Sequence, residues 1–281
     1  MKISVSSYSF QRLINSGAEN QLSIIKMASD LGFDGIEFIT LTPHNGCSQA
    51  DYAEKIKEEA EKYNLPITSY AVGANFTKDN YTEELAKVKA QVDIAQTLGA
   101  SVMRHDVMML NPPFPSFPQV LPWVADLCRE ITAYAAEKNV ATTVENHGFF
   151  FQDSTRIEQL YAAVNHPNFG VLLDIGNFLC VDEDPIFATS RLASYAKLAH
   201  AKDFHVKSGS EPNPGAGFFK SRGGNYLRGA IIGHGNVPVK QCADILKAAG
   251  YKGCLVIEFE GMEDVTQALK IGLANSRVYT S

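Results

Sequence analysis

The chain lacks the features that mark several common protein classes. No stretch approaches the roughly 18 apolar residues of a membrane span, and the amino terminus has no long apolar segment typical of a signal peptide. The five cysteines are scattered and form no C-x-x-C pair, so neither a disulfide framework nor a thiolate zinc site is indicated. We therefore expect a cytoplasmic protein with no membrane partner.

An excess of basic residues is also missing. The chain has 25 lysine and arginine residues against 31 acidic residues, which gives a formal net charge of −6. Because clustered positive charge dominates affinity for a phosphate backbone, we expect no nucleic-acid partner and favour a small-molecule ligand. The hydrophobic content of 45% is ordinary for a globular protein with a full core.

Strand-like apolar runs alternate with helical patterns along the whole chain. Five prolines in residues 111–122 remove backbone donors, so this segment is expected to begin without helix. Eight strand-then-helix units predict parallel pairing and closure into a (β/α)8 TIM barrel, an α/β fold, with residues 1–281 as a single domain. The expected helices cover about residues 20–31, 49–63, 83–98, 123–138, 155–164, 186–195, 239–249 and 265–275.

The alternative fold is a doubly wound open sheet. Its nucleotide-binding form carries G-x-G-x-x-G after the first strand, where this chain reads SYSFQRL. The barrel is therefore favoured.

Four of the apolar runs, VATTVENHG, FGVLLDIGN, KLAHAKD and GCLVIEFEG, each carry a carboxylate or imidazole near the end of the strand. The side chains are Glu145, Asp174, His200 and Glu258. Active sites of TIM barrels form at the carboxyl ends of the strands, so we expect these side chains to converge. Burying them costs several kcal/mol unless something compensates, and one divalent cation would do so. Glu260, on the same strand face as Glu258, is an alternative ligand or a supporting neighbour.

The motifs VENHG, LLDIGN, AHAKD and IEFEG, with GHGNV at residues 233–237, resemble the xylose isomerase-like sugar phosphate isomerase/epimerase family over the whole chain. The resemblance implies one Mn²⁺, with Mg²⁺, Co²⁺ or Zn²⁺ as alternatives, held by Glu145, Asp174, His200 and Glu258. It also implies a sugar, sugar phosphate or polyol ketone as substrate. In the ketose epimerases that the chain resembles, two glutamates, here Glu145 and Glu258, remove and return a proton through an enediolate.

The chain departs from the family pattern in two respects. Asn177 stands where many relatives carry a histidine, and Val206 and Lys207 stand where ketose 3-epimerases tend to place an arginine. The glycine-rich residues 206–236 are interpreted as a lid over the site. The further residues expected to line the pocket or contact the substrate are Glu37, His105, His147, Asn177, Lys202 and His205.

Three other functions compete with an isomerase or epimerase. An inosose-type dehydratase would use the same enediolate but expel a hydroxyl group. An apurinic-site endonuclease of the same superfamily needs a three-zinc cluster, and two of its expected ligand positions are changed: Asn177 replaces a histidine, and YLRGAII lacks an Asp-x-His pair. A non-catalytic sugar-binding barrel is the third, because fold alone does not establish chemistry. Assembly into a homo-oligomer stays open.

Overall fold

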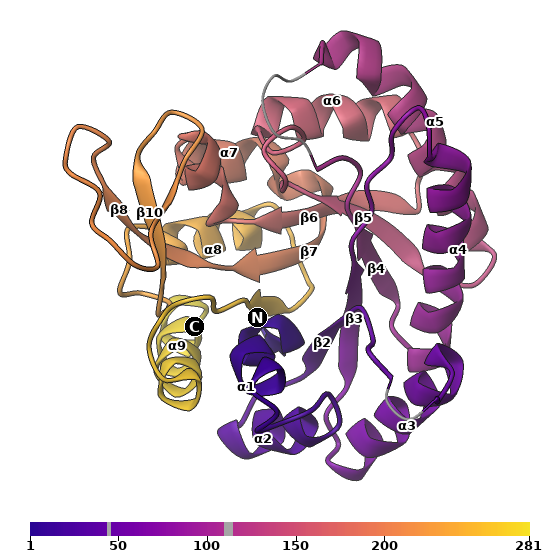
Figure 1. Ribbon diagram of the computed structural model, residues 1–281, viewed down its shortest axis with the longest axis horizontal. Coiled ribbons are helices and arrows are strands. Elements are labelled where there is room, and N and C mark those ends of the chain that lie inside the picture. The colour runs from indigo at the N-terminus through magenta and orange to yellow at the C-terminus, as the bar shows by residue number, and fades with distance from the viewer. Residues whose placement is uncertain (44–45, 110–114) are drawn as a thin grey trace.

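Parallel strands at the centre of the molecule close into a barrel in the order β1-β11-β7-β6-β5-β4-β3-β2 (Figure 1). The computed structural model describes residues 1–43, 46–109 and 115–281. The predicted TIM barrel, a single-domain fold, is confirmed. The barrel strands are β1 (Ile3–Ser6), β2 (Ile36–Ile39), β3 (Ile67–Val72), β4 (Val102–His105), β5 (Ala141–Glu145), β6 (Phe169–Asp174), β7 (Ala196–Ala201) and β11 (Leu255–Ile257).

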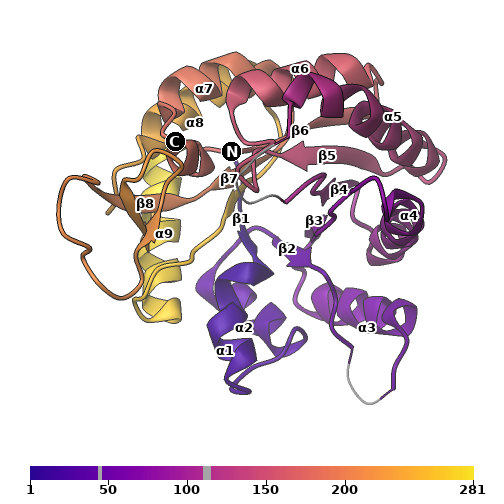
Figure 2. The same cartoon turned by 45° about the horizontal axis from the view of Figure 1, so that its top comes forward.

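Helices surround the strands on the outside of the barrel, as Figure 2 shows. Their positions follow the predicted alternation, apart from the short helix α1, which the sequence pattern did not indicate. Within the described ranges, no helix combines the length and apolar character needed to cross a membrane. The helices are α1 (Gln11–Asn15), α2 (Ser23–Leu31), α3 (Gln49–Lys62), α4 (Tyr81–Leu98), α5 (Phe117–Ala136), α6 (Ser154–Val164), α7 (Pro185–Leu192), α8 (Val239–Ala248) and α9 (Val265–Tyr279).

Helix α5 begins earlier than expected. The prediction that helix resumes only at Trp123 is wrong, because α5 starts at Phe117. Pro118 lies in the first turn, where a backbone N–H has no partner within the helix, and Pro122 lies inside the helix at the cost of one backbone hydrogen bond. Residues 111–114 of the proline-rich segment lie outside the described residues.

The barrel interior has an apolar layer beneath its carboxyl end. Leu172, Leu198 and Val256 form a small buried cluster that is separate from the large core between strands and helices. Each lies two residues before a predicted metal ligand, and side chains two apart on a strand share a face. The alternation therefore directs the side chains of Asp174, His200 and Glu258 toward the barrel axis, above this apolar layer.

Residues 203–230 contain a second sheet beside the barrel, which we term the arm. It consists of β8 (Asp203–Lys207), β9 (Phe219–Lys220) and β10 (Tyr226–Ala230), paired antiparallel in the order β8-β10-β9. Figures 1 and 2 show it projecting at one side of the molecule. The Arg222 guanidinium ties the arm to Asp153, with 2.6 Å between Nη1 and Oδ1. The segment interpreted as a lid, residues 206–236, thus contributes strands to an antiparallel sheet, and its closure over the site stays a prediction.

Candidate metal centre

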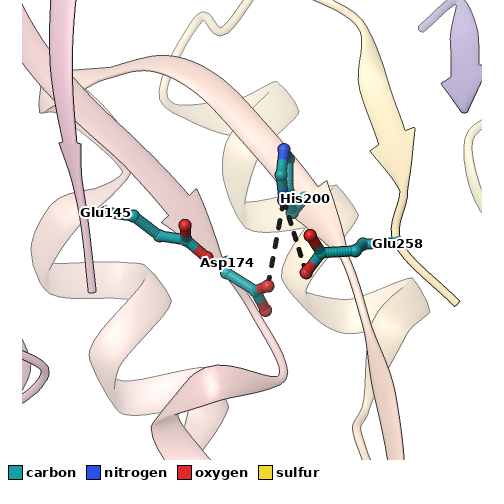
Figure 3. A group of neighbouring side chains, drawn as sticks. All are labelled: Glu145, Asp174, His200 and Glu258. Carbon is teal, nitrogen blue, oxygen red and sulfur yellow. Dashed lines mark ion pairs between the residues drawn. The ribbon is translucent and has the colours of Figure 1, made fainter. Parts of the chain in front are cut away.

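The four side chains predicted to bind a metal converge at the carboxyl end of the barrel. One ligand atom from each lies within 4.8 Å of the ligand atoms of the other three. Figure 3 shows the three carboxylates and the imidazole directed toward a common space. Three of the residues are buried and the fourth is half-buried; they are Glu145, Asp174, His200 and Glu258.

Two buried atoms of this group have no hydrogen-bond partner, namely Oδ2 of Asp174 and Nδ1 of His200. Nδ1 of His200 lies 4.0 Å from Oδ2 of Asp174 and 3.9 Å from Oε2 of Glu258. Buried polar atoms in proteins normally have a hydrogen-bond partner, so two buried atoms that lack one and face each other are suited to hold a ligand between them. Carboxylate oxygens and one imidazole nitrogen are a donor set that suits divalent cations. The residues present therefore fit a divalent metal ion.

The imidazole of His200 is held from its other side. Its Nε2 lies 3.1 Å from Oε2 of Glu37, and the Ser69 hydroxyl donates a 2.7 Å hydrogen bond to the same oxygen. Burial would lower the pKa of His200, but the Glu37 and Glu258 carboxylates raise it well above its ordinary value. Glu37, expected to line the pocket, thus lies behind the imidazole and directs Nδ1 at the candidate site.

The carboxylate of Asp174 is oriented by the backbone that follows it. Its Oδ1 accepts hydrogen bonds from the backbone N–H groups of Gly176 at 2.8 Å and Asn177 at 3.0 Å. Burial, together with the nearby Glu145 and Glu258 carboxylates, raises the pKa of Asp174 to about 6. The Lys202 ammonium opposes this rise, and a bound divalent cation would oppose it further.

Lys202 places a positive charge beside the cluster. Its ammonium contacts the Glu258 carboxylate, lies 3.4 Å from Oδ2 of Asp174 and donates to Oδ1 of Asn177 at 3.2 Å. Burial would lower the pKa of Lys202, but Glu258, Glu260 and Asp174 raise it well above its ordinary value. Burial alone would raise the pKa of Glu258. The charge of Lys202 outweighs this effect and holds the pKa of Glu258 well below its usual range. Lys202 therefore carries its charge throughout the physiological pH range.

Arg104 is a component of the site that was not expected from the sequence. Its Nη2 lies 2.5 Å from Oε2 of Glu145 and 2.7 Å from Oδ1 of Asp106, and its side chain is only 10% exposed. In the register of β4 and β5, Arg104 lies opposite Thr143, which shares the inward face with Glu145. Strand alternation alone would have selected Arg104 as the inward residue of SVMRH.

His105 was expected to line the pocket, but it does not line the cavity described below. It lies opposite Val144 in the register and belongs to the strand face that packs against the helices. The side chain is fully buried, and its Nδ1 donates a 2.9 Å hydrogen bond to the backbone carbonyl of Asp106. Burial lowers the pKa of His105 to about 4, so the ring is neutral at physiological pH.

A cavity of about 180 Å³ opens over the candidate metal ligands, and a second of about 160 Å³ adjoins it. His147, Lys202 and Glu260 line both cavities. Asn177 lines the second cavity, and its amide also donates to Oε1 of Glu145 at 2.8 Å. Among the expected substrate contacts, His147, Asn177 and Lys202 therefore line at least one of these cavities. The second cavity has an aromatic wall formed by Phe149, Phe204 and Phe219.

His205 lines neither of these cavities. It is a half-buried residue of β8, where successive side chains point to opposite faces of the sheet. Phe204 contributes to the aromatic wall, so its neighbour His205 faces the other way. The chain leaves the barrel strand at Lys202, and this break removes His205 from the expected row of inward residues.

A closed eight-stranded barrel with a buried Glu/Asp/His cluster at its carboxyl end defines a TIM-barrel protein with a candidate site for a divalent cation. Residues 25–277 match the model of the xylose isomerase-like TIM barrel family, and the chain belongs to that family. No curated protein matches the chain.

Solved structures with the same fold are distant in sequence. The probable 3-DHS dehydratase AsbF of Bacillus anthracis is 19% identical over 99% of both chains, with a TM-score of 0.77. D-psicose 3-epimerase with D-tagatose from Clostridium cellulolyticum H10 is 15% identical over 100% of both chains, with a TM-score of 0.75. A xylose isomerase-like TIM barrel protein from Mycobacterium smegmatis in complex with magnesium is 16% identical over 99% of this chain and 96% of that chain, with a TM-score of 0.75. At these identities the likeness shows the fold alone.

Proposed function

We propose that the protein is a metal-dependent isomerase or epimerase of a sugar, a sugar phosphate or a polyol ketone. The observation that carries the proposal is the convergence of four ligand atoms within 4.8 Å, in a group where two buried atoms have no hydrogen-bond partner. Family membership supports it, since the family consists mostly of metal-dependent enzymes that act on small sugar-like substrates. The epimerase with D-tagatose is one relative of the same fold.

The proposed cofactor is one Mn²⁺ held by Glu145, Asp174, His200 and Glu258. Three carboxylates and one imidazole suit hard or borderline cations, and the relative with bound magnesium supports a cation of this kind. When bound, the cation supplies polarisation of a substrate carbonyl, which acidifies the neighbouring C–H group.

The proposed acid–base pair consists of Glu145 and Glu258. Glu145 ends β5 and Glu258 follows β11, and on the shorter side β6 and β7 separate these strands around the barrel. Their carboxylates therefore reach the site from separate strands, and in the proposed reaction each faces one side of the substrate carbon. One glutamate removes a proton to form an enediolate and the other returns one to the opposite side.

Both glutamates are held in place by neighbouring side chains. Oε2 of Glu145 pairs with Arg104, and its Oε1 accepts a 2.8 Å hydrogen bond from the amide of Asn177. The Glu258 carboxylate contacts the ammonium of Lys202. Fixed carboxylates lose little freedom when the proton moves, which favours transfer at a defined carbon.

A dehydratase is the second candidate, and His147 is the residue that favours it. Its Nδ1 lies 3.0 Å from Oδ1 of Asp106, and the ring lines both cavities. Burial would lower the pKa of His147, but the Asp106 carboxylate raises it above its usual value. A protonated imidazole next to the substrate is suited to protonate a departing hydroxyl group. The dehydratase of the same fold is consistent with this chemistry in the family.

The metal-loaded protein, incubated in deuterium oxide with a panel of ketoses and keto-inositols, distinguishes the two reactions. An isomerase or epimerase incorporates deuterium at carbon without losing water, whereas a dehydratase yields an unsaturated or dehydrated product. Glu145→Gln and Glu258→Gln are expected to abolish turnover while circular dichroism shows an intact fold. The matched control is Glu61→Gln on the exposed end of α3, which should leave turnover unchanged. Full turnover in either of the first two variants would refute the assignment of the bases.

A further inference from the structure

A second group of potential metal ligands adjoins the candidate metal centre. Asp106, Glu145 and His147 each offer one ligand atom, and these atoms lie within 4.8 Å of one another. Three protein ligands are sufficient for many catalytic metal sites. Glu145 belongs to both groups, and a shared carboxylate is a common way to bridge two ions about 3.5–4 Å apart. By its ligands alone, the site has the composition of a two-metal centre.

The space among these three residues already holds a cation. Nη2 of Arg104 lies 2.7 Å from Oδ1 of Asp106, 2.5 Å from Oε2 of Glu145 and 3.2 Å from Nδ1 of His147. One guanidinium nitrogen thus contacts all three members of the group. The backbone carbonyl of Val72 accepts a 3.1 Å hydrogen bond from Nη1, which fixes the guanidinium in this place.

We infer that Arg104 is a built-in substitute for a second metal ion, so that the protein takes one ion where its carboxylates and histidines would otherwise take two. The guanidinium supplies the positive charge that Asp106 and Glu145 need when buried, and its nitrogen fills the position that a second ion would take. Arg104 is therefore the residue that sets the number of ions this end of the barrel binds. The inference rests on the proposed function in one respect, namely that one ion binds at the candidate metal centre of Glu145, Asp174, His200 and Glu258.

Removing the guanidinium tests this directly. Each protein is loaded with Mn²⁺, freed of loosely bound ions by gel filtration, and analysed for metal content per chain and by electron paramagnetic resonance. We expect one isolated Mn²⁺ in the wild type and two in Arg104→Met, with the spin coupling of ions that share a bridging carboxylate. Ions bound elsewhere on the surface would not couple. Arg104→Gln is the second variant, should Arg104→Met fail to fold.

Two control variants isolate the second site. Arg104→Met combined with Asp106→Asn removes one of its ligands and is expected to return the content to one isolated ion. Arg104→Lys keeps a positive charge and is also expected to hold one. One uncoupled ion in both Arg104→Met and Arg104→Gln would overturn the inference, as would two ions in the wild type. A wild type that binds no ion would refute the proposed metal dependence. Even then, two coupled ions in Arg104→Met or Arg104→Gln would support the role of Arg104.

Discussion

Oε2 of Glu37 lies 3.1 Å from Nε2 of His200, on the side of the imidazole that faces away from Asp174 and Glu258. Carboxylates in this position fix the orientation of a metal-binding histidine and increase its basicity. Glu37 comes from β2 and His200 from β7, so the contact joins distant parts of the chain across the barrel. The proposed metal affinity depends on this pair.

Glu37→Gln is expected to weaken metal binding by about 10- to 100-fold, because the neutral amide orients the imidazole less firmly and does not increase its basicity. Competition with a fluorescent chelator measures the dissociation constant for Mn²⁺. Glu61→Gln, an exposed carboxylate on α3, serves as the control and should retain wild-type affinity. Unchanged affinity in Glu37→Gln would show that Glu37 does not support the site.

Lys202→Met is expected to separate metal binding from turnover. Its ammonium lies 3.4 Å from Oδ2 of Asp174, and removing a positive charge at such a distance should tighten Mn²⁺ binding by at least about tenfold. Turnover should nevertheless fall, because Lys202 lines the cavity and is proposed to contact the substrate. The same chelator competition, paired with the deuterium assay, measures both effects. Weaker metal binding in this variant would contradict the electrostatic argument.

The stability of the metal-free protein is expected to decrease as the pH is lowered from about 6.5 toward 4, because His105 is buried in its neutral form. Its folded-state pKa of about 4 lies below its ordinary value of 6.5 because of burial. Between these values the unfolded chain binds more protons than the folded one, so each unit of acidification removes up to about 1.4 kcal/mol of stability. This contribution is present above pH 6.5 and is lost as the pH falls toward 4.

His105→Asn provides the comparison, since its amide offers an N–H in place of Nδ1 for the Asp106 carbonyl but does not titrate in this range. Urea unfolding of both proteins at several pH values from 7 to 4.5 gives the slope of stability against pH. The variant should show the shallower slope. Parallel curves for the two proteins would show that His105 does not contribute.

The apolar layer inside the barrel is expected to stabilise the fold beneath the site. Leu172 is fully buried in this layer, so Leu172→Ala should cost about 2–5 kcal/mol through lost burial and a cavity. Val278→Ala is the control, because this side chain is 67% exposed and its truncation should cost little. Urea unfolding at pH 7 measures both. A loss below about 1 kcal/mol for Leu172→Ala would mean that the barrel interior is loosely packed.

The barrel and the four convergent residues could be predicted from the sequence, because both depend on local rules. Apolar runs with a polar residue near the carboxyl end predict inward positions, and Asp174 and His200 lie there. On β4, the last polar residue of the run was chosen, which is His105, although strand alternation favours Arg104. Neighbouring residues of a strand point to opposite faces, so this difference of one residue replaced an inward side chain with an outward one.

Other features depend on contacts that local patterns do not contain. The break at Lys202 redirects the chain from β7 into the arm, and this turned His205 away from the cavity. The pairing of β8 with β10 joins residues separated by a glycine-rich segment, whose composition suggested a lid rather than a sheet. Helix α5 tolerates Pro122 because the rest of the helix packs on the core, and propensity alone did not reveal this.

Anomalous diffraction at the manganese edge, from crystals of the Mn²⁺-loaded protein, is the most direct test of the account. We predict a single strong peak among the carboxylates of Glu145, Asp174 and Glu258 and Nδ1 of His200, with ligand distances of about 2.0–2.4 Å. A map with no peak there, or with the ion held by Asp106 and His147 instead, would contradict it.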